Sequence, residues 1–148
     1  MDIKLVILVH VLGATIWTGG HLVLALGVLP DALRRRDPSS VAAFEARFER
    51  LGIPALLVQI ASGLWLAHRY LPDPARWFAF DSSLAAHIGA KLILLALTLA
   101  LAVHARVRLV PRLGPENLNT LAYHIIAVTV LAVLLVVMGV GIRAGGWI

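Results

Sequence analysis

The stretch IKLVILVHVLGATIWTGGHLVLALGVL, from Ile3 to Leu29, decides the fold of this chain. It is apolar over almost its whole length, and roughly 20 apolar residues suffice to cross a hydrocarbon core of about 30 Å. A cleaved signal peptide is the alternative, because Lys4 precedes the apolar run. The apolar part of such a peptide, however, covers only about 7–15 residues. The stretch is therefore predicted to be a transmembrane helix.

Three more apolar stretches follow, and they predict spans at about 52–70, 84–109 and 118–143. The composition agrees, since 60% of the 148 residues are hydrophobic and only 14% are charged, against roughly 25% charged in typical globular domains. We therefore expect an all-α integral membrane protein with its surface in contact with the lipid bilayer. It is predicted to be one domain over residues 1–148, a four-transmembrane-helix bundle with up-down-up-down topology.

The segments between the spans are predicted from their polar and helix-breaking residues. Residues 31–40 are expected to form a polar connector, with Ser39 or Ser40 as the N-cap of the next helix. An interfacial amphipathic turn containing Phe48 is expected before the second span. Pro54 is placed in the first turns of that span, where proline is best tolerated. Residues 71–83 are predicted to be an aromatic loop at the membrane interface.

The distribution of basic residues predicts the orientation of the chain in the membrane. Most of them fall in the first and third connectors: Arg34, Arg35, Arg36, Arg47, Arg50, Arg106, Arg108 and Arg112. By the positive-inside rule these connectors are cytoplasmic and both termini lie on the outer side, with Trp147 at the interface. A multi-pass protein of a bacterial-type inner membrane is expected. The net charge of +5 is therefore interpreted as an attraction to lipid headgroups, and no nucleic acid partner is expected.

All six histidines lie inside or at the ends of the predicted spans, although ionisable residues are costly there. They are His10, His21, His68, His87, His104 and His124. The chain has no cysteine, which excludes disulfides and thiolate metal sites. Imidazole ligates haem iron, copper and zinc. The histidines are therefore interpreted as ligands of haem or of a non-haem metal, with helix packing and proton relay as the remaining alternatives.

Helix geometry arranges these histidines in two layers. His10 and His21 share one face of the first span, about 16 Å apart along its axis, and Trp17 lies on the same face. Alternating helix directions place three histidines in an outer layer, namely His10, His68 and His87, and three deeper, namely His21, His104 and His124. The leading hypothesis is one or two bis-histidine haem b groups. It pairs His10 with His87 outside and His21 with His104 or His124 inside.

Lys91 lies one helical turn after His87 in the third span, and no Asp or Glu lies well inside any predicted span to pair with it. A haem propionate, a porphyrin carboxylate or iron itself is a candidate partner, and snorkelling to the outer surface is the alternative. His104 is rotated by roughly 100° from His87. We therefore expect it to address another neighbour, the helix that carries His124.

Three stretches resemble the copper-resistance protein D (CopD-like) superfamily, to which the HemJ-type protoporphyrinogen IX oxidases are related. They are HVLGATIWTGGHLVLALGVLP (10–30), FERLGIPALLVQIASGLWL (48–66) and HIGAKLILLALTLALAVHARVRLVPRL (87–113). The resemblance includes a Trp-x-Gly step at Trp17 and a Lys that follows a His in the third span. It implies a small haem-b-binding or copper-linked inner-membrane protein, often oligomeric. The HemJ-type likeness further implies that His10 and Lys91 are the functional pair.

The expected function is that of a cytochrome b-like redox protein, for electron transfer or for oxidation of a small or lipid-soluble substrate. Such a protein would be a haem-dependent membrane oxidoreductase with a redox partner that the sequence does not identify. The first alternative is a copper-handling membrane protein. Because methionine occurs only at Met1 and Met138, a His-rich Cu(II) site is favoured over a Cu(I) path. The second alternative is a non-catalytic membrane partner subunit.

Overall fold

The computed structural model describes residues 2–145, so the predicted interfacial position of Trp147 lies outside the described residues. These residues form α-helices with short π and 3-10 segments and contain no strand. The elements are α1 (Ile3–Leu22), η1 (Val23–Val28), α2 (Leu29–Arg35), α3 (Ser39–Tyr70), η2 (Pro74–Phe78), α4 (Ser83–His104), η3 (Ala105–Leu109), η4 (Val110–Arg112) and α5 (Leu118–Ala144). The predicted all-helical architecture is confirmed.

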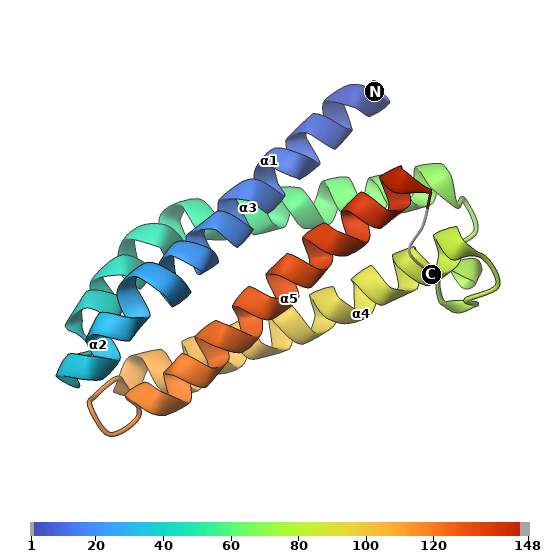
Figure 1. Ribbon diagram of the computed structural model, residues 1–148. Coiled ribbons are helices and arrows are strands. Elements are labelled where there is room, and N and C mark those ends of the chain that lie inside the picture. The colour runs from blue at the N-terminus through green and yellow to red at the C-terminus, as the bar shows by residue number, and fades with distance from the viewer. Residues whose placement is uncertain (1, 146–148) are drawn as a thin grey trace.

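Four continuous helices are long and apolar enough to cross a membrane: Ile3–Arg35, Ser39–Tyr70, Ser83–Arg112 and Leu118–Ala144. They alternate in direction and lie roughly side by side (Figure 1). Helix α1 packs against α3, α4 packs against α5, and contacts between α1 and α5 join the two pairs. We call the end of the bundle at which residues 36–38 and 113–117 lie the connector end.

Buried residues form three clusters along the bundle. At the connector end Leu24, Leu29, Ala32, Val41, Leu121, Ala122 and Ile125 pack together. Trp17, Val128 and Ala132 pack in the middle. Ala67, Leu71, Ala85 and Ile88 pack at the opposite end. In contrast, Leu26, Leu57, Val103 and Val107 are each more than 60% exposed, as expected for side chains that face lipid instead of protein.

Glycines let α1 and α3 approach closely. A Cβ atom at Gly13 would lie 3.0 Å from the carbonyl oxygen of Ala55 and 3.2 Å from the Cβ of Gln59. A Cβ at Gly20 would clash with the ring of Phe48. In lipid, helix association depends on van der Waals packing more than on the hydrophobic effect, so such small residues favour a close interface. Gly13 and Gly20 therefore leave room for α3 against this face of α1.

The first connector is shorter than predicted. The helix continues to Arg35, helped by ion pairs from Asp31 to Arg34 (3.1 Å) and to Arg35 (2.9 Å). Arg36 then adopts a left-handed conformation, with φ of 54°, and ends the helix. Residues 31–35 lie on a helix and not in the polar connector that was predicted, because pairing of charges one turn apart stabilises the helical conformation.

The start of α3 also differs from its prediction. Ser39 is the first helical residue, and neither Ser39 nor Ser40 caps the helix. Instead Asp37 accepts hydrogen bonds from the Ser39 backbone N–H (2.9 Å) and from its hydroxyl (2.8 Å). These bonds hold the pKa of the Asp37 carboxyl below its usual value. The predicted amphipathic turn and the second span form one helix, so Pro54 lies deep inside α3 and not in its first turns.

Candidate functional site

His21 is buried where α1 passes into the π-helical segment η1. Its Nδ1–H donates to the backbone carbonyl of Trp17 at 2.9 Å, which leaves the Nε2 atom with the lone pair. The imidazole ring lies 4.4 Å from the Trp17 ring and 5.6 Å, edge-on, from the Phe48 ring. The shared face of His21 and Trp17 predicted from the sequence is confirmed, and α3 covers it.

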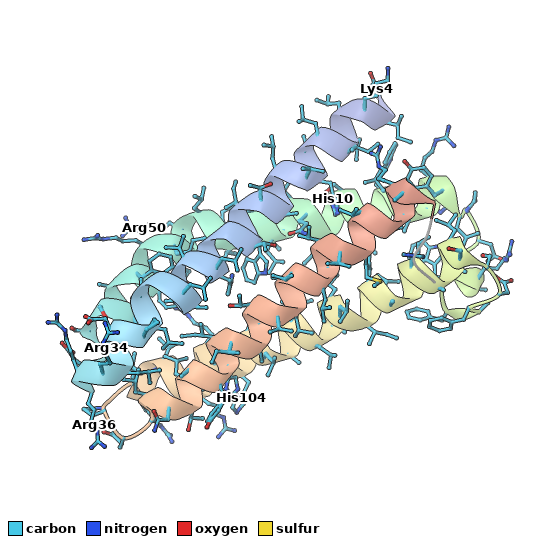
Figure 2. The ribbon with its side chains drawn as sticks, viewed as in Figure 1. Lys4, His10, Arg34, Arg36, Arg50 and His104 are labelled. Carbon is cyan, nitrogen blue, oxygen red and sulfur yellow. The ribbon has the colours of Figure 1, made fainter. Side chains whose placement is uncertain are left out.

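His104 of α4 and His124 of α5 form a direct pair. Nδ1 of His104 lies 2.9 Å from Nε2 of His124, and the rings stack with centroids 5.0 Å apart. His124 Nδ1–H donates to the carbonyl of Thr120 (3.0 Å), so its Nε2 accepts the hydrogen bond from His104. His104 is exposed and lies near the connector end (Figure 2). The predicted contact between His104 and the helix of His124 is confirmed.

His21 and His124 line one cavity of about 140 Å³, which we call the histidine cavity. Trp17, Glu45, Glu49 and Arg106 belong to its wall. Sites for organic cofactors typically occupy about 300–1,000 Å³, so this cavity does not accommodate a haem. It is large enough for a metal ion with a few waters, at about 30 Å³ per water. The Nε1–H of Trp17 is buried and has no acceptor within the described residues.

Glu45 and Glu49 are the site residues that sequence reasoning missed. They come before the predicted start of the second span, but the longer α3 carries both of them into the wall of the histidine cavity. Glu49 Oε2 forms an ion pair with Arg106 Nη1 at 2.6 Å, which joins α3 to η3. The i, i+4 spacing of the two glutamates in a helical segment was the available signal, because it places them on one face.

His10 is held by α3 in the half of the bundle remote from the connector end (Figure 2). Its Nδ1 lies 3.0 Å from the backbone carbonyl of Gln59 and 2.9 Å from the hydroxyl of Ser62. Gly63 allows this approach, since a Cβ there would lie 3.0 Å from Cε1 of His10. His10 therefore contributes to the α1–α3 interface, and its predicted role as a metal or haem ligand stays a prediction.

His87 and Lys91 lie on α4 in the same half of the bundle. His87 is 1% exposed, and its Nδ1–H donates to the backbone carbonyl of Ser83 at 2.7 Å. The Nζ of Lys91 approaches α5, where a Cβ at Gly139 would lie 3.4 Å away. His68, by contrast, is exposed on α3. The ligand roles of His87 and Lys91 stay predictions.

Within residues 2–145, no three His, Asp or Glu side chains converge closely enough to hold a metal ion as they stand. The structure therefore brings together His104 with His124, and His124 with His21 across a cavity, without completing a coordination sphere. A metal at this place needs water or a rearranged carboxylate to complete its ligands.

A family model described as Copper resistance protein D matches residues 42–142, which is more than half of the chain. The match includes His87, Lys91, His104 and His124, and it begins after the helix that carries His10 and His21. No curated protein and no solved structure matches the chain.

Proposed function

Because the chain belongs to the copper resistance protein D family, we propose that it is a copper-handling membrane protein that binds Cu(II) at His104 and His124. The observation that carries this proposal is the 2.9 Å between His104 Nδ1 and His124 Nε2. Two cis ligands each about 2.0 Å from a metal lie about 2.8 Å apart. The pair is therefore spaced for one metal ion, whereas the axial nitrogens of a haem lie about 4 Å apart across the iron.

The donor types support Cu(II) as the oxidation state that binds. The chain has no cysteine, and methionine occurs only at Met1 and Met138. Nitrogen ligands suit Cu(II), whereas Cu(I) favours sulfur. To bind, His104 shifts its proton from Nδ1 to Nε2, so that both facing nitrogens offer lone pairs. The move is a change of tautomer and leaves the imidazole neutral.

His21 is the third nitrogen in this proposal, and it acts from the opposite side of the histidine cavity. Its Nδ1–H is already committed to the Trp17 carbonyl, the arrangement by which metal-binding imidazoles are commonly oriented. The unpartnered Nε1–H of Trp17 donates to a water in this cavity. Copper is the cargo of the protein in this scheme and not a resident cofactor.

The proposal includes an orientation in a bacterial-type inner membrane. The connector end carries Arg34, Arg35 and Arg36 on one side and Arg108 and Arg112 on the other. Following the positive-inside rule, we assign this end to the cytoplasm and both termini to the outer side. The histidine cavity then lies in the cytoplasmic half of the membrane.

Titration of the purified full-length protein with Cu(II), followed by electron paramagnetic resonance, tests the proposal. We expect one Cu(II) per chain with hyperfine splitting from at least two nitrogens. His104→Ala and His124→Ala are expected to lower the affinity at least tenfold, while His68→Ala, on the exposed face of α3, serves as the matched control. Equal binding by His124→Ala and the wild type would remove the site.

An optical spectrum of the same sample tests the haem b alternative. A Soret band with resolved α and β bands after reduction would indicate a haem bound elsewhere in the bundle, for which His10 and His87 are the predicted ligands. A protein that binds Cu(II) without these bands supports the proposed function. A haem spectrum without Cu(II) binding would replace it.

A further inference from the structure

A groove of about 880 Å³ opens at the connector end between the first half of α3 and the η3–η4 segment. Its polar lining residues are Asp37, Ser39, Glu45, Glu49, Arg50 and Arg106. The groove and the histidine cavity share part of their walls, namely Glu45, Glu49, Ile53, Arg106 and Val110. The groove and the histidine cavity are therefore adjacent, with these side chains between them.

The shared wall contains one ion pair and one carboxylate that does not belong to that pair. Glu49 is paired with Arg106 across the two helices. Glu45 lies one turn earlier on α3 and forms no ion pair within the described part of the chain. An unpaired carboxylate in the wall of a cavity attracts a cation, because its charge is incompletely compensated by the protein. The groove is lined by three carboxylates, of Asp37, Glu45 and Glu49, and by two basic side chains, of Arg50 and Arg106.

A second observation points to a ligand in the space that these residues enclose. Trp17 is 7% exposed and belongs to the wall of the histidine cavity, and its buried Nε1–H has no acceptor among the described residues. A buried donor without an acceptor is costly. A water carried by a hydrated cation supplies such an acceptor. The nitrogen lone pair at His21 Nε2 lies on the same cavity.

The ion pair has the features of a contact that opens. The side chains of Arg106 and Glu49 are 58% and 30% exposed, so the surrounding protein leaves both of them partly uncovered. Arg106 belongs to the π-helical segment Ala105–Leu109, and such segments are frequent at functional sites and interrupt the regular hydrogen bonding of the helix.

We propose that this groove is the mouth through which copper ions enter or leave the histidine cavity, with Glu45 as the carboxylate that receives the cation. The Glu49–Arg106 ion pair is the gate, because a cation that binds the carboxylates replaces the guanidinium as their counter-ion. No bond other than metal–ligand bonds forms, and no electron is transferred. The inference rests on the proposed function, since it describes the route to the same histidines.

Stopped-flow mixing of the full-length protein with Cu(II) tests the gate. The rate of uptake is measured from the quenching of tryptophan fluorescence, because Trp17 lies beside His21. Arg106→Gln is expected to speed Cu(II) uptake about tenfold, because the carboxylates lose their competing counter-ion. Glu45→Gln is expected to slow uptake about tenfold. Arg106→Lys keeps the positive charge and is expected to stay close to the wild-type rate. A general loss of structure would change the uptake rates of Arg106→Gln and Glu45→Gln in the same direction. Opposite changes therefore indicate a gate.

Arg108→Gln and Glu116→Gln are the matched controls, because both residues lie at the connector end and line neither space. Equilibrium nitrogen hyperfine splitting is expected to be unchanged in all five variants, since the imidazoles are intact. The gate would be overturned if Arg106→Gln and Glu45→Gln took up Cu(II) at rates within twofold of these controls. The proposed function would still stand if both variants bound Cu(II) normally at equilibrium. Absence of Cu(II) binding by the wild type would overturn both.

Discussion

Trp17 holds His21 through two contacts at once: its carbonyl accepts the Nδ1–H of His21 at 2.9 Å, and its ring lies 4.4 Å from the imidazole. The two residues are one helical turn apart, so α1 alone creates both contacts. The imidazole is therefore fixed in one tautomer before any ligand arrives. Preorganisation of this kind lowers the entropic cost of binding.

Gly13→Ala is expected to destabilise the protein by about 1–3 kcal/mol, because the added methyl group would meet the backbone of α3, which cannot turn aside. Thermal unfolding in detergent measures the effect. Gly19→Ala is the control, since a Cβ atom there would have no neighbour within 4 Å among the described residues. Alanine at this position is expected to be neutral or to stabilise the helix by up to about 1 kcal/mol. Equal loss in both variants would contradict close packing at Gly13.

Lys91→Met is expected to raise the thermal stability of the ligand-free protein. The Nζ of Lys91 lies in the bundle beside Gly139, no carboxylate of the described residues pairs with it, and such a charge is costly inside a membrane. Replacing it with an apolar side chain of similar length is expected to gain about 1–3 kcal/mol. Lys4→Met at the start of α1 is the control and is expected to be neutral. A lower stability of Lys91→Met would show that the ammonium contributes more to the fold than its burial costs.

Asp37→Ala is expected to lower the melting temperature at pH 7, because the N–H and the hydroxyl of Ser39, at the start of α3, lose their acceptor. The pKa of Asp37 is lower in the folded protein than the usual value of an aspartate, because the Ser39 N–H and hydroxyl stabilise the carboxylate. Its stabilising effect is therefore fully present above the unfolded pKa and disappears as the pH falls through the lower folded pKa. Melting curves recorded from pH 7 down to about 3 are expected to converge for the wild type and Asp37→Ala.

Asp37→Asn provides the control for that pH dependence. Its side-chain oxygen still accepts the Ser39 N–H, but it carries no charge that titrates in this range. The difference in melting temperature between Asp37→Asn and Asp37→Ala is expected to stay constant with pH. A wild-type protein that behaves like Asp37→Asn throughout would show that the carboxylate charge is not involved.

Reporter fusions test the orientation. Alkaline phosphatase inserted within residues 36–38 is expected to be inactive, and the same enzyme fused after Trp147 is expected to be active, as the arginine distribution requires. A green fluorescent fusion at each position is expected to give the opposite pattern. Reversed results for both reporters would place the connector end, with the groove and Arg106, on the outer side.

The sequence predicted the four spans but only part of the candidate site. The predicted spans fall inside the four long helices, because apolar length is a direct consequence of bilayer thickness. The prediction that His104 addresses His124 was also correct, since angular position on a helix follows from residue spacing alone. The contribution of Glu45 and Glu49 was missed, because the boundary of the second helix was placed at the edge of the apolar run and not at Ser39.

By itself, the sequence determined that this chain forms four long helices with histidines at several depths. A bilayer leaves no other partner for the backbone polar groups of an apolar stretch, so hydropathy is sufficient for that conclusion. Only the tertiary structure decided that His10 contacts α3 and that Glu49 pairs with Arg106. Those contacts depend on the rotation and crossing of the helices, which follow from close packing at residues such as Gly13 and Gly20. Packing of this kind leaves no trace in the hydropathy of the chain.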